Sequence, residues 1–201
     1  MIRIIYKEYD EKTLSDAREK ARFEHRLGRT LLGRLLAEQG LTPVNLSALE
    51  DLLDQGIHGK PCLKDRKDLH FNISHCPGLA ACAISTEPVG LDVEKIRPFP
   101  ESVLKKLLTE EERQWLAMGD FPWEEALFRL WTLKESRIKL SGEGLKQDLR
   151  SFSCFPDRKK ARICSSEPDI FYKQWQPLPG YIMSVCSASP PEDDLLPERV
   201  L

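Results

Sequence analysis

The stretch "EEALFRLWTLKESRIK" (124–139) predicts one long helix. How this helix packs decides how the chain around it folds, and one charged residue on its apolar face makes that packing a question. At about 100° of rotation per residue, one apolar face of this helix comprises Leu127, Phe128, Trp131 and Ile138. Glu135 lies inside that face, and Lys134 also interrupts it. Because burying a carboxylate without a partner is costly, either this end of the helix is exposed or a cation faces Glu135.

A pair of acidic residues lies upstream in "VGLDVEKI" (89–96), which reads as a strand. Asp92 and Glu94 are two residues apart and point to one face, whereas Leu91 and Val93 point into a core. Adjacent carboxylates repel each other unless a cation lies between them, and oxygen ligands without His or Cys suit Mg²⁺. If the helix packs on this strand, Glu135 joins the pair around one metal ion. The alternative is an acidic strand face that simply meets solvent.

Further polar residues could bind an anion. Lys139 lies one helical turn after Glu135, so the two form either a surface ion pair of roughly 0.3–0.5 kcal/mol or a cation beside a metal-bound substrate. Ser74 and His75 end a short strand in "NISH" (72–75), where a hydroxyl, an imidazole and backbone N–H groups can hold phosphate. Lys60 adds a cation in the stiff "GKP" loop (59–61). A hydrolase triad is unsupported by the neighbouring residues, and "GKP" is not a Walker motif.

The rest of the chain alternates between helical and strand patterns. Helices are predicted at 13–38, 46–54, 101–118 and 122–141. Strands are predicted at 2–9, 71–74, 79–85 and 89–96, and in "SFSCF", "KARIC", "DIFYKQW" and "GYIMSVCSAS". The last of these is similar to "GLAACAIS" (78–85). The sequence therefore predicts an α+β fold made of two similar halves, 1–97 and 98–201, related by a pseudo-twofold axis.

The composition limits the classes of partner. A net charge of −2 lacks the basic footprint of a nucleic-acid-binding protein, and no apolar run approaches the length of a membrane span. The six cysteines form no C-x-x-C pair, which indicates a reducing compartment. The start, "MIRIIYKEYD", alternates like a strand and is too polar for a signal peptide. We therefore expect a cytoplasmic protein without a nucleic-acid or membrane partner.

Four motifs together resemble one family. "GKP", "FNISH", "VGLDVE" and "WTLKESRIK", in this order and spacing, are similar to those of the Sfp-type 4′-phosphopantetheinyl transferases. That family carries an (I/V)-G-(I/V/L)-D-(I/V)-E strand and a W-(S/T)-x-K-E-(S/A)-x-x-K helix, and this chain departs from neither pattern. "GRTLLG" and "GYIMSVCSA" extend the resemblance to nearly the whole chain. The two-half length implies a monomer rather than the trimeric single-half form.

The resemblance implies a reaction and its components. Coenzyme A donates its phosphopantetheine arm to a serine hydroxyl of an acyl or peptidyl carrier protein, and 3′,5′-ADP is released. Mg²⁺, with Mn²⁺ as an alternative, binds Asp92, Glu94, Glu135 and the pyrophosphate of coenzyme A. Phosphoryl transfer depends chiefly on positioning and charge neutralisation, which fits this set of groups.

The resemblance also implies residue roles. Lys139 neutralises phosphate charge, and Glu135 is the candidate general base as well as a metal ligand. The residues expected to bind coenzyme A are Lys20, Thr30, Lys60, Ser74, His75 and Lys139. Glu112 matches an acidic position of the family and is a candidate accessory acid. An acidic, helical carrier protein is expected to dock on 99–118, where Phe99, Val103, Leu104, Leu107 and Leu108 lie beside Lys105 and Lys106; the alternative is that these leucines are core.

Three rival hypotheses remain open. A metal-dependent nuclease places its Glu and Lys two apart on a strand, whereas Glu135 and Lys139 are four apart on a helix. A non-catalytic protein of the same fold would bind coenzyme A or a carrier without transfer. A structural two-domain protein would carry four ordered motifs by coincidence.

Overall fold

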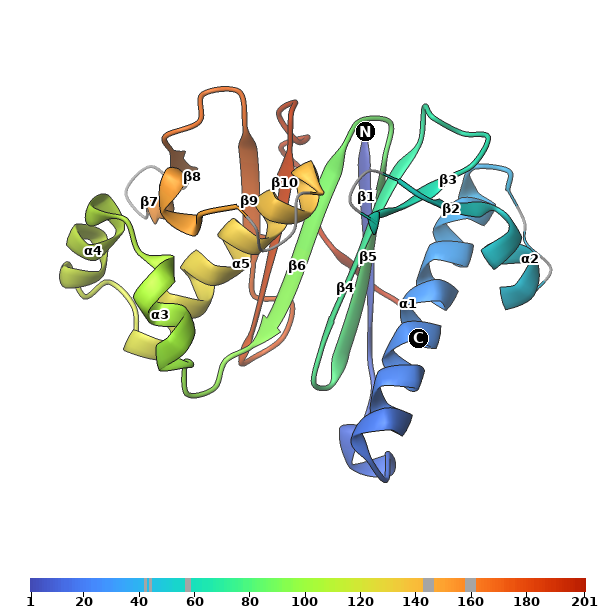
Figure 1. The fold of residues 1–201 in the computed structure, drawn as a ribbon, viewed down its shortest axis with the longest axis horizontal. Helices are drawn as coiled ribbons and strands as arrows, with labels where there is room; N and C mark the ends of the chain where they lie inside the picture. The colour runs from blue at the N-terminus through green and yellow to red at the C-terminus, as the bar shows by residue number, and fades with distance from the viewer. Residues whose placement is uncertain (42, 44, 57–58, 143–146, 158–161) are drawn as a thin grey trace.

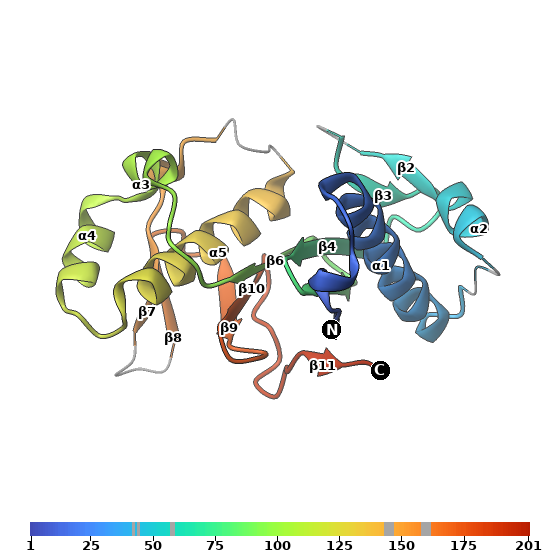
Figure 2. The same cartoon turned by 90° about the horizontal axis from the view of Figure 1, so that it is seen from below.

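The computed structural model describes the chain from Met1 to Leu201 except residues 42, 44, 57–58, 143–146 and 158–161. Two sheets stand side by side at its centre, and the two long helices lie toward opposite ends of the molecule (Figures 1 and 2). Among the described residues, none of the helices has the length and apolarity needed to cross a membrane. The α+β fold class predicted from the sequence is confirmed.

The first sheet has the strand order β11-β1-β5-β4. It comprises β1 (Ile2–Glu8), β4 (His70–Cys76), β5 (Leu79–Ser85) and β11 (Glu198–Arg199). Neighbouring strands are antiparallel except β11, which runs parallel to β1. Helix α1 (Ala17–Glu38) covers one face with a leucine stripe at helical spacing: Leu27, Leu31, Leu32, Leu35 and Leu36. The opposite face of this sheet packs into a core shared with the second sheet.

The second sheet has the order β6-β10-β9 and is antiparallel throughout. It comprises β6 (Val89–Lys95), β9 (Phe171–Trp175) and β10 (Tyr181–Ser187). Helix α5 (Trp123–Ser141) crosses its face and lies close against β6. Gly90 makes this approach possible, because a Cβ there would lie 1.9 Å from the Ser136 carbonyl oxygen. The glycine of "VGLDVE" thus brings the helix that carries Glu135 onto the strand that carries Asp92.

Shorter elements complete the two ends. On the α1 side they are α2 (Leu46–Asp51), β2 (Leu53–Gln55) and β3 (Pro61–Leu63). On the α5 side they are α3 (Glu101–Leu107), α4 (Glu110–Ala117), β7 (Cys154–Asp157) and β8 (Arg162–Ser165). Single 3-10 turns span Glu11–Thr13 and Leu149–Ser151.

Several predicted boundaries were wrong for local reasons. The first long helix begins at Ala17 rather than residue 13, because the Asp16 side chain caps the N–H groups of Arg18 and Glu19. The segment 101–118 is two helices, since Thr109 starts α4 with a capping box. The helix predicted at 46–54 ends at Asp51, and Leu53 already belongs to a strand.

The predicted division at residue 97 stays a prediction, and the sheet pairing bears on how it is drawn. Strand β6, placed in the first half, forms its ladder with β10 of the second half. Strand β11, near the C-terminus, returns to the first sheet. The two similar segments form β5 and β10. Each is an inner strand with an antiparallel neighbour on both sides, and each packs against a long helix, β5 against α1 and β10 against α5.

Candidate active site

The candidate site lies at the seam between the two sheets, where β4 runs beside β6. Side chains rather than a backbone ladder join the two strands here: Asn72 Oδ1 accepts a hydrogen bond from the Leu91 N–H at 2.9 Å. Two residues on, Ser74 Oγ accepts one from the Val93 N–H at 3.2 Å. The spacing of two puts both polar side chains on one face of β4, and this face meets Asp92 of β6 through Ser74.

Ser74, Asp92 and Lys139 meet directly at this seam. Ser74 Oγ donates to Asp92 Oδ1 at 2.9 Å, and Lys139 Nζ lies 2.9 Å from Ser74 Oγ and 2.7 Å from Asp92 Oδ1. The hydroxyl therefore uses its one donor and accepts twice, which saturates its hydrogen-bonding capacity. In this arrangement Ser74 holds Asp92 and Lys139 in place, and Lys139 comes from the last turn of α5.

Glu94 is held by two groups outside the predicted set. Arg97 Nη1 lies 2.8 Å from Glu94 Oε2, and Trp131 Nε1 donates to Glu94 Oε1 at 3.3 Å. The guanidinium of Arg97 also lies over the Phe128 ring, 5.1 Å from its centroid. Burial raises the pKa of Glu94, while the hydrogen bond from Arg97 opposes that shift.

Glu135 reaches the same region from α5 but finds no partner for one oxygen. Within the described part of the chain, Glu135 Oε1 and Asp92 Oδ2 are both buried without a hydrogen bond. The pKa of Glu135 is raised to about 7, chiefly by burial and then by the charge of Asp92, while the charge of Lys139 opposes the shift. The helix end is therefore not simply exposed, and Glu135 faces Asp92 and Lys139 at the seam.

A divalent cation is compatible with this arrangement. Two buried carboxylate oxygens without partners, close to Glu94, form a hard-oxygen set of the kind that Mg²⁺ prefers. The described residues contain no group of three His, Cys, Asp or Glu side chains placed to hold a metal ion as they stand. In this arrangement Lys139 occupies one oxygen of Asp92, and Arg97 occupies one oxygen of Glu94.

Comparison with known proteins identifies the family. A sequence model described as the 4′-phosphopantetheinyl transferase superfamily matches residues 88–186, which include Asp92, Glu94, Glu135 and Lys139. The 4′-phosphopantetheinyl transferase Sfp of Bacillus subtilis is 33% identical over 207 residues, covering 96% of this chain and 92% of its own length. This chain belongs to the 4′-phosphopantetheinyl transferase superfamily.

Other relatives agree. The 4′-phosphopantetheinyl transferase gsp of Aneurinibacillus migulanus is 34% identical over 79% of this chain and 68% of its own length. Enterobactin synthase component D of Salmonella typhi is 31% identical over 66% of this chain and 55% of its own. Membership confirms the family resemblance and makes this chain an enzyme that transfers 4′-phosphopantetheine.

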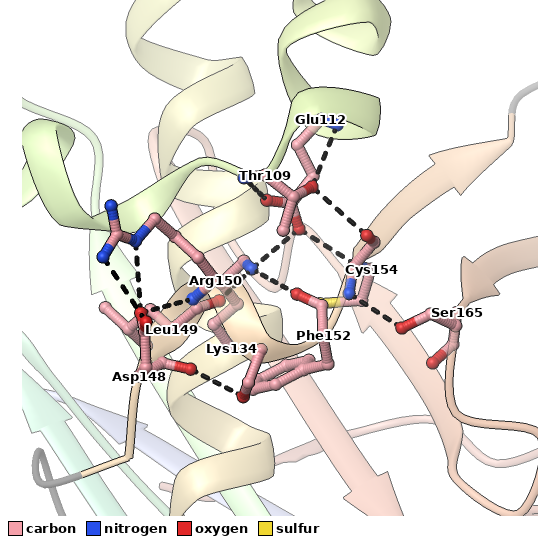
Figure 3. Close-up of polar contacts among 12 residues, drawn as sticks. Thr109, Glu112, Lys134, Asp148, Leu149, Arg150, Phe152, Cys154 and Ser165 are labelled. Carbon is pink, nitrogen blue, oxygen red and sulfur yellow. Dashed lines mark hydrogen bonds and ion pairs between the residues drawn. The ribbon is translucent and has the colours of Figure 1, made fainter.

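Glu112 of this transferase lies in a different cluster from the acids at the seam. Its carboxylate is fully buried and pairs with Lys134 Nζ at 2.9 Å, and Lys134 is fully buried as well (Figure 3). Glu112 Oε2 accepts from the Thr109 N–H at 2.8 Å, and Oε1 accepts from the Cys154 N–H at 3.0 Å. Its contacts are those of a structural ion pair that joins α4, α5 and β7, rather than those of an accessory acid beside Asp92.

The residues expected to bind coenzyme A are spread over three places. Ser74 and Lys139 lie at the seam, and His75 Nδ1 lies 3.3 Å from a carboxylate oxygen of Glu24. Lys60 Nζ donates to the carbonyls of Val89 and Leu140, at 3.1 and 3.4 Å, and burial lowers its pKa to about 8.

The two candidates on α1 have their partners outside the seam. Lys20 pairs with Glu11 at 2.9 Å, and the exposed Thr30 donates to its own helix at the Arg26 carbonyl. Ten residues of helix separate Lys20 from Thr30, about 15 Å along the axis.

Sequence reasoning missed Arg97, Glu24 and Tyr9. Arg97 lies three residues after Glu94, just beyond the end of β6. In an extended strand this spacing does not bring two side chains together, so nothing in the sequence pairs them. The Tyr9 hydroxyl donates to Glu24, which lies inside an otherwise basic stretch of α1 and contacts His75 on β4. The contacts of Glu24 join distant segments of the chain, so no local pattern predicts them.

Proposed function

We propose that this transferase uses coenzyme A as the donor and a carrier-protein serine as the acceptor, with a divalent cation at the seam. Family membership supports the reaction, and one observation carries the site: Asp92, Lys139 and Ser74 in mutual contact, beside two buried carboxylate oxygens that lack partners. Such oxygens are costly unless a ligand completes them. Asp92, Glu94 and Glu135 would hold the cation, Mg²⁺ or Mn²⁺.

A bound cation would neutralise pyrophosphate charge and polarise the attacked phosphorus. The side chains of the enzyme supply the rest. Lys139, on the last turn of α5, can turn from Asp92 to a phosphate oxygen because its side chain remains partly exposed. Ser74 and the β6 backbone keep Asp92 in position during that exchange.

Glu135 is our candidate for the group that removes the serine proton. A general base works best with a pKa near the operating pH, and burial beside Asp92 raises the pKa of Glu135 to about 7. A bound cation would lower that pKa. The two roles of Glu135, base and metal ligand, therefore compete, and a metal-ligating Glu135 would act through water.

Lys60 and His75 are proposed to bind the coenzyme from the first sheet. Ser74, whose single hydrogen is donated to Asp92, is proposed to contribute by positioning Lys139 rather than by donating to a phosphate. A cavity of about 200 Å³ beside Lys60 is lined by Pro61, Phe71, Pro88 and Leu140, which suits a flat ring next to a phosphate. Thr30 and Lys20 remain proposed contacts to the coenzyme from α1, and their separation along the helix means that they meet different parts of it.

The carrier protein is proposed to dock over α3. A cavity of about 490 Å³ lies there, lined by Val103, Lys106, Trp131, Leu149 and Arg150 among others. Trp131 connects it to the seam through Glu94. The exposed Lys105 and Lys106 complement an acidic carrier helix. Leu107 and Leu108 belong to the core, as the alternative reading of this segment expected.

We also propose a monomer in the cytoplasm. Residues from both sheets of a single chain meet at the seam, so the proposed site draws these residues from one copy. All six cysteines are free, which accords with a reducing compartment. Sedimentation at micromolar concentration tests the oligomeric state.

The direct test is the intact mass of an apo carrier protein after incubation with coenzyme A and Mg²⁺. We expect the gain of one phosphopantetheinyl group, and a rate about 100–1,000-fold lower for Glu135→Gln. Glu124→Gln, an exposed glutamate in the first turn of the same helix, is the matched control and should transfer normally.

Two outcomes would contradict the proposal. Absence of transfer across fatty-acid, polyketide and peptide synthetase carriers, with coenzyme A still bound, would favour the non-catalytic binding protein. Near-normal turnover of Glu135→Gln at saturating Mg²⁺ would remove Glu135 from both of its roles.

A further inference from the structure

Glu24 is a buried acid that the proposed reaction does not use. It lies on α1 with only 7% of its surface exposed, among residues that are mostly basic or apolar. One carboxylate oxygen accepts the hydroxyl of Tyr9, and the other lies 3.3 Å from His75 Nδ1. The ring of Tyr9 packs on Phe23 with centroids 5.1 Å apart, which keeps its hydroxyl on Glu24. A buried carboxylate with two defined partners is a positioned group rather than a solvated charge.

His75 stands between Glu24 and the seam. It directly follows Ser74 on β4, and its side chain is 43% exposed, so the ring can meet a ligand. The charged or titratable groups that face it are Glu24 and His25 on α1, Lys139 on α5 and Asp92 on β6. Partial burial lowers the pKa of His75, and the charge of Glu24 opposes this shift. With Nδ1 engaged by Glu24, Nε2 is the nitrogen left for a ligand.

We propose that Glu24 is a positioning residue that fixes His75 through Nδ1 and presents Nε2–H to a phosphate of coenzyme A. This inference rests on the proposed donor. The chemistry follows from the two forms of imidazole: a neutral ring with its hydrogen on Nδ1 offers only a lone pair at Nε2, whereas the imidazolium donates from both nitrogens. A carboxylate on Nδ1 favours the imidazolium, and a phosphate on Nε2 favours it again, so Glu24 and the ligand reinforce each other.

A purely structural role for Glu24 is the alternative, because the carboxylate also anchors Tyr9. The chain offers a matched pair of variants that separates the two. Glu24→Gln keeps the size and an oxygen acceptor but removes the charge that acts on His75. Tyr9→Phe removes the other hydrogen bond of the same carboxylate and leaves the contact with His75 in place.

The experiment is calorimetric titration of the protein with coenzyme A, without a carrier protein, between pH 6 and 8.5. We expect Glu24→Gln to weaken binding about tenfold near pH 7.5, and Tyr9→Phe to weaken it less than threefold. Affinity of the unmodified protein should fall as pH rises and His75 loses its proton, and Glu24→Gln should move that fall to lower pH. In a His75→Ala background, Glu24→Gln should have no further effect, since its partner is gone.

The outcomes are separable. If Glu24→Gln binds coenzyme A like the unmodified protein at every pH, or weakens binding equally without His75, the positioning role is wrong while the proposed function stands. If the unmodified protein binds no coenzyme A, both are wrong. Should Glu24→Gln fail to fold, ¹⁵N spectra of the imidazoles in the unmodified protein decide. Hydrogen on Nδ1 of His75 is expected, and an Nδ1 without hydrogen would overturn the proposal.

Discussion

Lys134 and Glu135 are neighbours in sequence on α5, yet they enter two buried polar clusters of opposite character. Lys134 Nζ has three acceptors, namely Glu112 Oε1 and the carbonyls of Leu149 and Phe152, which use all of its hydrogens (Figure 3). Glu135 has a buried oxygen with no partner among the described residues, and Asp92 beside it has another. The difference teaches where to look for function: a satisfied network holds the fold, and an incomplete one is completed by a ligand.

The two clusters also cooperate mechanically. The Lys134 network joins the middle of α5 to α4, to the Leu149–Ser151 turn and to β7, and this fixes the rotation of the helix about its axis. Gly90 fixes the distance from α5 to β6. Glu135 and Lys139 are therefore aimed at Asp92 by parts of the molecule that take no part in the chemistry.

The largest effect on stability is expected from breaking the Lys134–Glu112 cluster, in which every polar group of Lys134 has a partner. Lys134→Met leaves the Glu112 carboxylate buried without its counter-ion, and we expect the free energy of unfolding to fall by about 3–5 kcal/mol. Urea denaturation followed by circular dichroism measures it. Lys105→Met, on the exposed surface of α3, is the control and should change stability by less than about 0.5 kcal/mol. A Lys134→Met protein as stable as the control would mean that the buried pair does not hold α5.

Removing the charge of Glu135, in the cluster at the seam that lacks partners, should raise the free energy of unfolding rather than lower it. The pKa of Glu135 in the folded chain, about 7, lies above its ordinary value of 4.5, so ionisation of Glu135 opposes folding. Stability from this group is fully present below pH 4.5 and is lost as pH rises through 7. Glu135→Gln removes that loss.

In EDTA at pH 8 we therefore expect Glu135→Gln to be more stable than the unmodified protein by on the order of 1–2 kcal/mol, after allowance for solvent screening. The difference should vanish near pH 4.5. Thermal unfolding across this range measures it, and a variant that is less stable than the unmodified protein at pH 8 would contradict an incomplete cluster.

A smaller effect, on the affinity for Mn²⁺, should show whether a metal ion can replace Arg97 beside Glu94. Arg97 is partly exposed and lies 2.8 Å from Glu94, where it would compete with the proposed metal ion. We expect Arg97→Gln to bind Mn²⁺ about threefold more tightly, because one competing cation is gone. Titration of Mn²⁺ followed by electron paramagnetic resonance measures this without turnover. Arg150→Gln, whose partner Asp148 is exposed, is the control, and weaker Mn²⁺ binding by Arg97→Gln would show that Arg97 supports the site instead.

Sequence reasoning recovered the parts of this site that depend on local periodicity. The spacing of two put Asp92 and Glu94 on one face of β6, and the helical spacing put Glu135 and Lys139 on one face of α5, as the structure has them. The position of Glu135 inside an apolar helix face correctly indicated an unusual carboxylate, because that face is buried in the structure.

The contacts that sequence could not supply are long-range. Lys134 looked like a second irregularity of the same kind as Glu135, but its partner lies 22 positions away in α4, and no periodicity links the two helices. The same holds for Glu24 and His75, which belong to different elements of the first half. The break at Thr109 was missed because a leucine pattern ran through it, and the capping box overrode that pattern.

The most direct test of the central claim applies one substitution to both clusters. Glu112→Gln and Glu135→Gln are compared at pH 8 in EDTA for stability, and with coenzyme A, Mg²⁺ and an apo carrier for transfer. We predict that Glu112→Gln lowers the free energy of unfolding by about 2–4 kcal/mol while the folded fraction still transfers, and that Glu135→Gln raises stability while transfer falls at least 100-fold. Loss of stability in both variants, or normal transfer by Glu135→Gln, would contradict the division between a cluster that holds the fold and one that performs the reaction.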